Sequence, residues 1–295
     1  EIALSTRPIQ TRDFSWDINL NFSKNSNKVK ELDGESDMFE LEKATWLDVQ
    51  VAAKVGENFG SIVGPDFQRN EKGDILIDPQ TGLPQYDKSN HVLGNASWDW
   101  TGGLLTNFTY KNISLVAVFD VKVGADLYSM SARAAHESGK SPETLAGRDA
   151  WYRSEEERLA AGIAKGADNW KPTGGFVAPG VIDNGDGTYR PNDIYINPED
   201  YWMSVCRNAP SMFIYDNSYV KCRELTLSYN VPKSWLKNVV SGLTVSFVAR
   251  NPFIVWKNIP NIDPDSNYNN TTGMGLEYGS LPSRRSYGFN VNVKF

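Results

Sequence analysis

The stretch Arg284–Phe295, RRSYGFNVNVKF, decides the fold class of this chain. Single polar or small residues separate its apolar ones, which are Tyr287, Phe289, Val291, Val293 and Phe295. In an extended chain this period of two turns all apolar side chains to one face. Such a strand suits a half-buried soluble sheet and also the wall of a transmembrane barrel. The aromatic last residue favours the barrel, because the chain termini of soluble domains are usually polar and frayed, whereas a terminal strand in lipid must be paired to its end.

The same alternation recurs along the chain. Its clearest copy is Phe14–Ser23, FSWDINLNFS, which has about the 9 to 11 residues that a tilted strand needs to cross a bilayer. Further strands are expected at Trp46–Val55, Leu104–Tyr110, Ile113–Val123, Ile214–Asn230 and Leu243–Phe253, with Phe59–Phe67 as a strand or an excursion. Turn or loop structure is expected at Thr6–Asp13, Lys24–Lys43, Arg69–Trp100 and Ile254–Ser283.

The connections between these strands alternate in length. Long ones precede Leu104, follow Val123 and follow Phe253, whereas Lys111-Asn112 and Val231–Gly242 are short. Outer-membrane barrels have this asymmetry, with short periplasmic turns and long outer loops. We therefore predict an all-β fold, an antiparallel transmembrane β-barrel segment of roughly seven to nine strands. Residues 124–212 are predicted to form a long extracellular loop without a convincing strand, carrying one amphipathic helix at Arg148–Gly162.

Composition narrows the function classes. A net charge of −6 without a basic patch makes nucleic acid an improbable partner. The apolar runs, such as Leu115–Phe119, are far shorter than the roughly 18 to 20 residues of a membrane helix, which excludes a helical membrane protein. Aromatic residues make up 12% of the chain, as in the girdles of a membrane barrel. A secreted, aromatic-rich carbohydrate-binding or glycan-hydrolysing β-sandwich remains the alternative.

Five stretches carry a family resemblance. They are DFSWDINLNFSKNSNKV (Asp13–Val29), LGNASWDWTGGL (Leu93–Leu104), IYDNSYVKCRELTLSYNVPKSWL (Ile214–Leu236), ARNPFIVWKNIPNIDPDS (Ala249–Ser266) and GLEYGSLPSRRSYGFNVNVKF (Gly275–Phe295). With them the chain resembles the C-terminal part of SusC/RagA-family TonB-linked outer-membrane proteins, the nutrient importers of Bacteroidetes. Ala249 stands where Gly is common in that family and Cys222 where Leu is common, and neither departure changes the assignment.

The resemblance implies a barrel of about 22 strands around an N-terminal plug domain. Glu1 begins inside an apparent strand, so we expect a piece of a longer protein without its plug domain and signal peptide. The resemblance further implies import of glycans or peptides across the cell outer membrane, with no enzymatic role and no cofactor. The implied partners are a SusD-like surface lipoprotein, TonB through the absent N-terminal part, the remainder of the same barrel and outer-membrane lipid. Tyr287, Phe289, Val291, Val293 and Phe295 would form the C-terminal assembly signal.

No catalytic or metal-binding constellation stands out. His91 and His136 are expected to be solvated loop residues, and Glu155–Glu157 with Arg158 a solvated helix face. Asp183, Asp186 and Asp193 fit tight turns better than a calcium loop. Pairing of Cys206 with Cys222 stays open.

Two further sets of residues are functional candidates. Aromatic residues of the long loop could contact a ligand or the lid protein, or could simply hold the loop together: Trp151, Tyr152, Trp170, Tyr189, Tyr195, Tyr201 and Trp202. Charged residues at polar strand positions are expected to face the lumen, pairing with each other or the plug or lining a solute path: Asp17, Asp120, Lys122, Glu224, Arg250 and Lys294.

Overall fold

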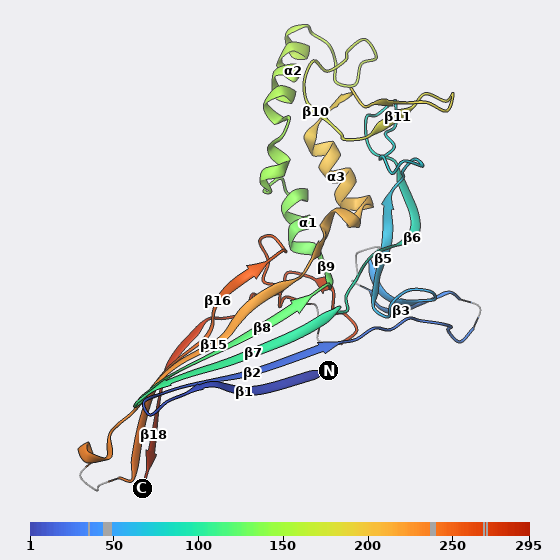
Figure 1. The fold of residues 1–295 in the computed structure, drawn as a ribbon. Coiled ribbons are helices and arrows are strands. Elements are labelled where there is room, and N and C mark those ends of the chain that lie inside the picture. Colours follow the sequence, from blue (N-terminus) through green and yellow to red (C-terminus); the bar gives the residue numbers. More distant parts are fainter. Residues whose placement is uncertain (35, 44–48, 237–239, 268, 270) are drawn as a thin grey trace.

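A seven-stranded antiparallel sheet is the largest element of the computed structural model, which describes all residues except 35, 44–48, 237–239, 268 and 270. Its strands follow one another in space as they do in the chain (Figure 1). They are β1 (Ile2–Gln10), β2 (Phe14–Lys24), β7 (Trp100–Tyr110), β8 (Ile113–Val123), β15 (Tyr219–Asn230), β16 (Gly242–Lys257) and β18 (Ser286–Lys294). Within the described residues, no strand pairs with the outer edges of β1 and β18.

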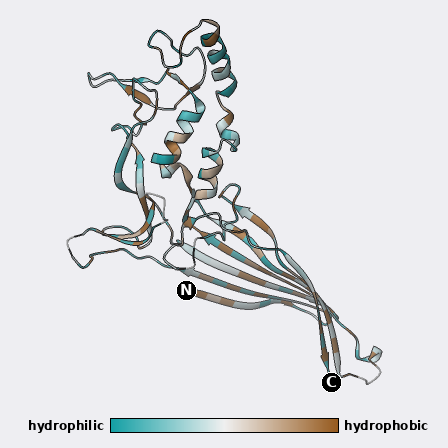
Figure 2. Ribbon diagram, turned by 180° about the vertical axis from the view of Figure 1, so that it is seen from behind, coloured by the Kyte–Doolittle hydropathy of each residue, from teal (hydrophilic) through white to brown (hydrophobic). Residues whose placement is uncertain are grey.

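The register gives this main sheet two unlike faces. One row of facing side chains is apolar across six strands: Trp16, Phe108, Leu115, Leu227, Phe247 and Phe289. The neighbouring row on the other face is polar: Ser15, Thr109, Ser114, Ser228, Ser246 and Asn290. Figure 2 shows the resulting alternation of hydrophobic and hydrophilic residues along the strands. Cross-strand alignment therefore sorts most apolar and polar side chains to opposite faces of the sheet, with Leu105, Val116 and Val118 as apolar residues on the polar face.

The apolar face of the main sheet is exposed. Leu20, Phe247 and Phe289 keep 43%, 37% and 80% of their surface accessible. A β-sandwich would bury such a face under a second sheet. The sandwich alternative is therefore wrong for this sheet, and the barrel segment is the fold class that the structure supports. Among the described helices, none has the length and hydrophobicity to cross a membrane.

A smaller sheet lies between β2 and β7 in the chain. It consists of β3 (Met38–Lys43), β4 (Gln50–Lys54), β5 (Ser61–Phe67) and β6 (Tyr86–Asn95). The segment Phe59–Phe67 is thus a strand, but it belongs to this sheet, so the main sheet has seven strands. The predicted strand Trp46–Val55 is only partly described, because 44–48 lie outside the described residues.

A helical subdomain, Asp126–Asp216, stands between β8 and β15 at one end of the main sheet (Figure 1). Its helices are α1 (Met130–Glu137), η1 (Pro142–Leu145), α2 (Arg148–Ala160), α3 (Pro198–Asn208) and η2 (Pro210–Phe213). Its short strands are β9 (Asp126–Ser129), β10 (Phe176–Val177), β11 (Val181–Asp183), β12 (Tyr189–Pro191), β13 (Tyr195–Ile196) and β14 (Ile214–Asp216). Near the C-terminus, η3 (Lys233–Trp235) follows β15, and β17 (Leu276–Glu277) pairs in parallel with β9.

The hydrophobic core joins the helical subdomain to the small sheet. Val205 and Phe213 of the subdomain are fully buried with Ile62 of β5 and Leu276 of β17. All members of this core in the described residues come from outside the main sheet. The subdomain is therefore a packed body. The main sheet leaves many large apolar side chains exposed, although Ala117, Tyr219, Cys222 and Ala249 are buried.

Several local predictions are confirmed and others are wrong. Phe14–Ser23, the hairpin around Lys111-Asn112 and the helix beginning at Arg148 are confirmed. The helix is not amphipathic, because its buried residues are Ser154 and Arg158. The predicted loop structure is wrong where β3, β6 and the elements of 124–212 form, and the turn predicted at Thr6–Asp13 is strand as far as Gln10. Register shifts explain two of these failures, because they interrupt the alternation of β1 and β6.

Candidate functional site

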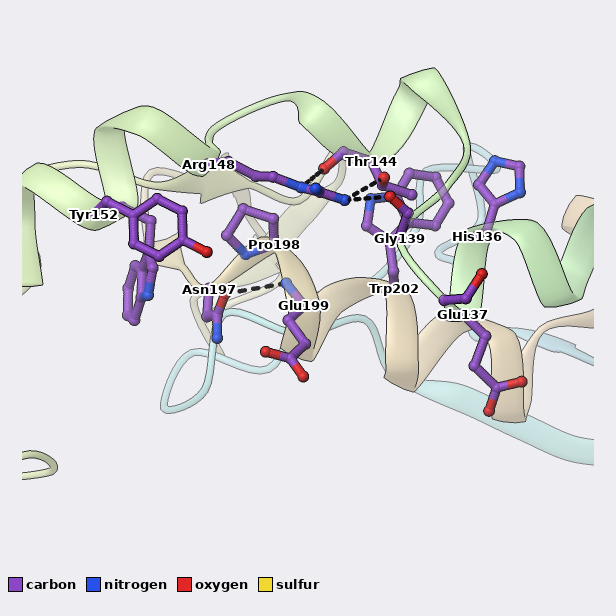
Figure 3. Close-up of a pocket in the computed structure, with 12 residues that line it drawn as sticks. His136, Glu137, Gly139, Thr144, Arg148, Tyr152, Asn197, Pro198, Glu199 and Trp202 are labelled. Carbon is purple, nitrogen blue, oxygen red and sulfur yellow. Dashed lines mark hydrogen bonds between the residues drawn. The ribbon is translucent and has the colours of Figure 1, made fainter.

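A pocket of about 270 Å³ lies in the helical subdomain, between α1, η1, α2 and the start of α3 (Figure 3). Three of the seven aromatic candidates line it, Trp151 and Tyr152 from α2 and Trp202 from α3. A wider hollow of about 640 Å³ shares Trp151 and Asn197 with it and adds Tyr195. The structure thus brings four aromatic candidates together around the N-terminus of α3.

The other three aromatic candidates lie elsewhere. Tyr201 is buried, with its ring 4.6 Å from that of Phe176, and burial raises the pKa of Tyr201 to about 12. Tyr189 lies on the β11–β12 hairpin. Trp170 follows α2, and its Nε1 is buried without a hydrogen-bond partner in the described part of the chain. Tyr201 is therefore a packing residue, whereas the roles of Tyr189 and Trp170 remain predictions.

Arg148, at the start of α2, is held in the pocket by neutral acceptors. Its Nε donates to the Thr144 carbonyl at 2.7 Å, and its Nη2 donates to the Gly139 carbonyl at 2.8 Å and to the Thr144 hydroxyl at 2.5 Å. Gly139 allows this approach, since its φ is 67° and a Cβ there would lie 2.7 Å from Arg148 Nη2. The hydrogen bonds to Thr144 and Gly139 therefore fix the guanidinium in place.

The opposite wall of the pocket is α3. Asn197 caps this helix by accepting a hydrogen bond from the Glu199 amide at 3.1 Å, and Pro198 occupies the first turn. The His136 ring packs 4.7 Å from the Trp202 ring, and His136 Nδ1 lies 2.8 Å from the Ala132 carbonyl oxygen. The prediction of a solvated loop residue is wrong for His136, whose side chain is 11% exposed on α1. His91 lies on β6, 3.0 Å from Asp87, with a 41% exposed side chain, so it is solvated but not in a loop.

The acidic residues singled out from the sequence make local contacts. Asp183 and Asp186 accept hydrogen bonds from the amides of Gly185 and Thr188 in their own turns, and Asp193 pairs with Arg190. Glu155 lies 2.9 Å from Arg158, and this hydrogen bond lowers the pKa of Glu155. Arg158 is buried, so the solvated-face prediction is wrong for it. Cys206 and Cys222 are both free thiols.

The charged candidates of the main sheet share its polar face. Glu224 pairs across the strands with Arg250 at 3.5 Å, and Asp17 pairs with Arg7. Lys122 lies over the Trp98 and Tyr219 rings, and Asp120 pairs with Arg223. Lys294 is at the end of β18, opposite Gly242. Neighbours thus neutralise several of these charges, and their orientation toward a lumen remains a prediction.

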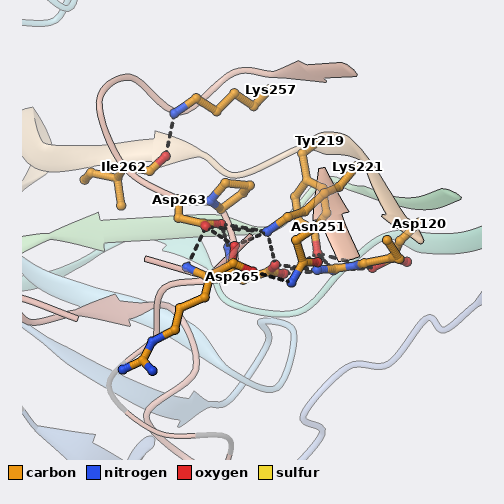
Figure 4. Close-up of polar contacts among 12 residues, drawn as sticks. Asp120, Tyr219, Lys221, Asn251, Lys257, Ile262, Asp263 and Asp265 are labelled. Atoms are coloured by element: carbon orange, nitrogen blue, oxygen red, sulfur yellow. Dashed lines mark hydrogen bonds and ion pairs between the residues drawn. The ribbon is translucent and has the colours of Figure 1, made fainter. Parts of the chain in front are cut away.

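A buried ionic network was missed by the sequence reasoning (Figure 4). Lys221 Nζ of β15 lies 3.1 Å from Asp263, 2.5 Å from Asp265 and 2.6 Å from the Ser283 hydroxyl. All three partners belong to the connection between β16 and β18, and the Lys221 side chain is 2% exposed. Arg223 bridges the same Asp265 to Asp120 of β8. The network therefore fastens this connection to the polar face of the main sheet.

Both aspartates of the connection stay ionised. Burial alone would raise the pKa of Asp265, but hydrogen bonds from Arg223 and Lys221 outweigh it and hold the pKa well below its usual range. Burial also opposes ionisation of Asp263, and bonds from Ser283, the Asp265 amide and Lys221 again lower its pKa. The carboxylates of Asp263, Asp265 and Asp120 thus surround the Lys221 and Arg223 cations.

The same connection also holds α1. Glu277 of β17 is 1% exposed and accepts hydrogen bonds from the Ser131 amide at 3.0 Å and the Ser131 hydroxyl at 2.7 Å. The Ser129 hydroxyl donates to the same carboxylate at 2.9 Å. A buried carboxylate at the first turn of α1 satisfies amide donors that the helix leaves free. One connection therefore contacts the main sheet through Asp263 and Asp265 and the helical subdomain through Glu277.

The residues of the proposed assembly signal lie on or next to β18. Tyr287, Phe289, Val291 and Val293 face Ala249, Phe247, Val245 and Leu243 of β16. All four are exposed, and Phe295 follows the strand with 97% of its surface accessible. Their role in assembly remains a prediction.

The chain is similar to TonB-dependent receptors over its full length. TonB-dependent receptor P3 of Formosa agariphila is 23% identical over 325 residues, which cover 100% of this chain and 28% of the relative. TonB-dependent receptor SusC of Bacteroides thetaiotaomicron is 23% identical over 309 residues, again 100% of this chain and 26% of the relative. The chain thus spans less than a third of the relatives it matches. No protein-family model matches it.

Solved structures share the fold. A chain of the RagAB peptide importer in its closed-closed state superposes with a TM-score of 0.62 at 16% identity, covering 99% of this chain and 29% of that one. The open-open state of the same importer gives a TM-score of 0.56 at 16% identity, covering 99% and 28%. The main sheet and the helical subdomain therefore recur together in a known importer.

Proposed function

Because the chain belongs to the SusC/RagA family of TonB-dependent receptors, we propose that it forms part of the barrel wall of an outer-membrane importer. The exposed apolar face of the main sheet is the observation that carries this proposal. Apolar rows cross from β1 to β18 without a covering layer in the described residues, as a lipid-facing wall requires. The strands of the main sheet span 9 to 16 residues, enough to cross a bilayer when tilted.

The two edge strands of the main sheet, β1 and β18, need further strands to pair with. Unpaired backbone groups of β1 and β18 in lipid would each cost several kcal/mol, so a lone sheet of this kind is unstable in a membrane. The remainder of the same barrel would supply the missing pairs. A plug domain in that remainder would contact TonB, so this segment carries no chemistry of its own and no enzymatic role.

The helical subdomain, which contains most of the loop predicted at residues 124–212, is proposed as the extracellular part. The hydrophobic core that it shares with the small sheet, and the ionic network of the nearby β16–β18 connection, suit a rigid outer platform. One of the similar solved structures is a peptide importer, RagAB. The resemblance to SusC and RagA implies a SusD-like lipoprotein as lid and glycans or peptides as cargo. We propose the same partnership for the complete protein, with the pocket around Trp151 near the contact region.

Extraction of the complete receptor from cells tests the membrane assignment. We expect it in the outer-membrane fraction, released by detergent and retained by washing at high pH. Recovery of folded, monodisperse protein from the periplasm without detergent contradicts the proposal. Uptake of the cargo by cells should also stop when TonB is removed, and uptake that persists contradicts the energised mechanism.

A further inference from the structure

The Arg148 guanidinium carries a charge that no carboxylate in the described residues neutralises. Its Nε and Nη2 are used by Thr144 and Gly139, whereas Nη1 has no hydrogen-bond partner in the same part of the chain. Arg133, Arg158 and Arg190 of the subdomain each pair with an acid within 4 Å, whereas Arg148, Arg153 and Arg207 have no such pair in the described residues. Among these last three, Arg148 is the one whose guanidinium is fixed by hydrogen bonds to backbone and hydroxyl acceptors. A fixed guanidinium with one free edge is a receptor for an anionic oxygen group.

The groups around Arg148 suit a polyhydroxylated ring. Tyr152, four residues after Arg148 on α2, lines the same pocket (Figure 3), is 65% exposed and offers a flat apolar surface. Glu199 lines the same pocket with a carboxylate acceptor, and Asn197 adds an amide. Glu137 also lines it, but pairs with Arg133 at 3.4 Å. Sugar rings present C–H groups on one face and hydroxyl donors at the edge, which match an aromatic plate flanked by carboxylates.

We propose that this pocket binds one residue of an acidic oligosaccharide. The pyranose ring lies on Tyr152, its carboxylate accepts from Arg148 Nη1, and its hydroxyls donate to Glu199. The volume of about 270 Å³ is below that of pockets for drug-sized ligands and limits the occupant to about one sugar ring. The carboxylate of a peptide could also reach Arg148. The backbone amides of a peptide, however, need a row of hydrogen-bond acceptors, whereas the carboxylates that line this pocket are separate from one another.

This inference rests on the proposed function only in taking the bound sugar as part of the imported cargo. Binding is measured on the purified receptor, without transport. Uptake that persists in cells without TonB therefore contradicts the import proposal alone, whereas absence of sugar binding to the purified receptor contradicts the pocket alone.

Saturation-transfer NMR on the complete receptor in detergent tests the pocket. Glucuronate, glucose and acetyl-diglycine are each added in large excess. We expect transfer to glucuronate, with C–H protons of one ring face most strongly affected, and little transfer to glucose. Tyr152→Leu should weaken glucuronate binding about fivefold and Arg148→Gln about tenfold. Tyr110→Leu, which alters a 54% exposed ring on the β7–β8 hairpin and outside the pocket, is the matched control and should leave binding unchanged.

Three results overturn the proposal. The first is no transfer to glucuronate from the folded wild-type receptor. The second is transfer that is equal in wild type and Tyr152→Leu, a variant of an exposed side chain that leaves the pocket wall intact. The third is binding of acetyl-diglycine in preference to glucuronate, which makes the site one for peptide carboxylates. Arg148→Lys separates the effect of charge from that of positioning. It keeps the positive charge but loses the planar guanidinium, whose hydrogen bonds to Thr144 and Gly139 fix its position.

Discussion

Lys221 Nζ on β15 lies 3.1 Å from the carboxylate of Asp263, a residue 42 positions further along the chain. The Lys221 side chain is 2% exposed and that of Asp263 is 8% exposed. Because removing two charges from water is costly, such a pair adds little net stability compared with apolar residues. Its effect is positional, since only one placement of the β16–β18 connection satisfies Lys221, Asp263 and Asp265 together.

Replacing Lys221 should release this connection. Lys221→Met keeps the length of the side chain but leaves Asp263 buried without its cation, at a cost of about 3 to 5 kcal/mol. We expect faster hydrogen exchange in peptides of the β16–β18 connection and little change in the β7–β8 hairpin. Lys72→Met, at an exposed turn position, is the control.

A second variant separates loss of the pair from loss of packing. Adding Asp263→Asn to Lys221→Met removes the uncompensated charge, so part of the protection should return. Protection that falls by the sum of the two single effects would show that the residues act independently.

Acid should loosen the connection only at low pH. The pKa values of Asp263 and Asp265 are lower in the folded protein than in the unfolded chain, so their stabilisation is complete above the unfolded value, about 3.9, and is lost as pH falls through the folded values. We expect the hydrogen-exchange protection of peptides in the β16–β18 connection to be constant from pH 7 to about 5, after correction for the intrinsic exchange rate, and to decline below about pH 4. Asp265→Asn, measured alongside, should be less stable at pH 7 and decline less. A steep loss between pH 7 and 5 contradicts this sign.

The two faces of the main sheet could be predicted from sequence because alternation needs no knowledge of the partner strand. In Phe14–Ser23 and in the terminal strand, the residues that alternation assigns to each face are the ones that the register places there. The alternation failed at a bulge in β15, where Cys222 faces Phe119 and Glu224 faces Val118, leaving Arg223 as an extra residue. Strict alternation would place Lys221 and Glu224 on opposite faces of the sheet, whereas the bulge places both on the polar face.

The pocket was only partly predictable. The aromatic residues near it are visible in the sequence, but their grouping depends on α1 and α3, which we did not predict. α3 begins at Asn197-Pro198, a cap and first-turn proline that were a usable signal. Arg148 carried no signal of its own, because its importance comes from contacts with Thr144 and Gly139 and from the absence of an acid beside it in the described residues.

Neutralising Glu277 should unravel the start of α1. Glu277→Gln keeps the shape but removes the charge that accepts from Ser129 and Ser131, and hydrogen bonds to a charged group contribute about 1.5 to 3 kcal/mol. We expect hydrogen exchange of the first-turn amides of α1 to accelerate while α2 is unaffected. Glu71→Gln, at an exposed turn, is the matched control. Equal exchange in both variants would mean that Ser129 alone caps the helix.

Leu20 and Asn19 are adjacent on β2 and point to opposite faces, so they form a matched pair for the membrane assignment. Leu20 faces Leu4 and Leu104 in an apolar row, whereas Asn19 faces Ser5 and Leu105. Both side chains are exposed, which removes differences in packing. If the apolar face meets lipid, Leu20→Arg should cost about 2 to 4 kcal/mol near the bilayer centre and Asn19→Arg much less. Denaturant unfolding of the complete receptor, refolded into lipid vesicles, measures both. Equal costs would place both faces in water and contradict a barrel wall, because only lipid distinguishes the same charge on two sides of one strand.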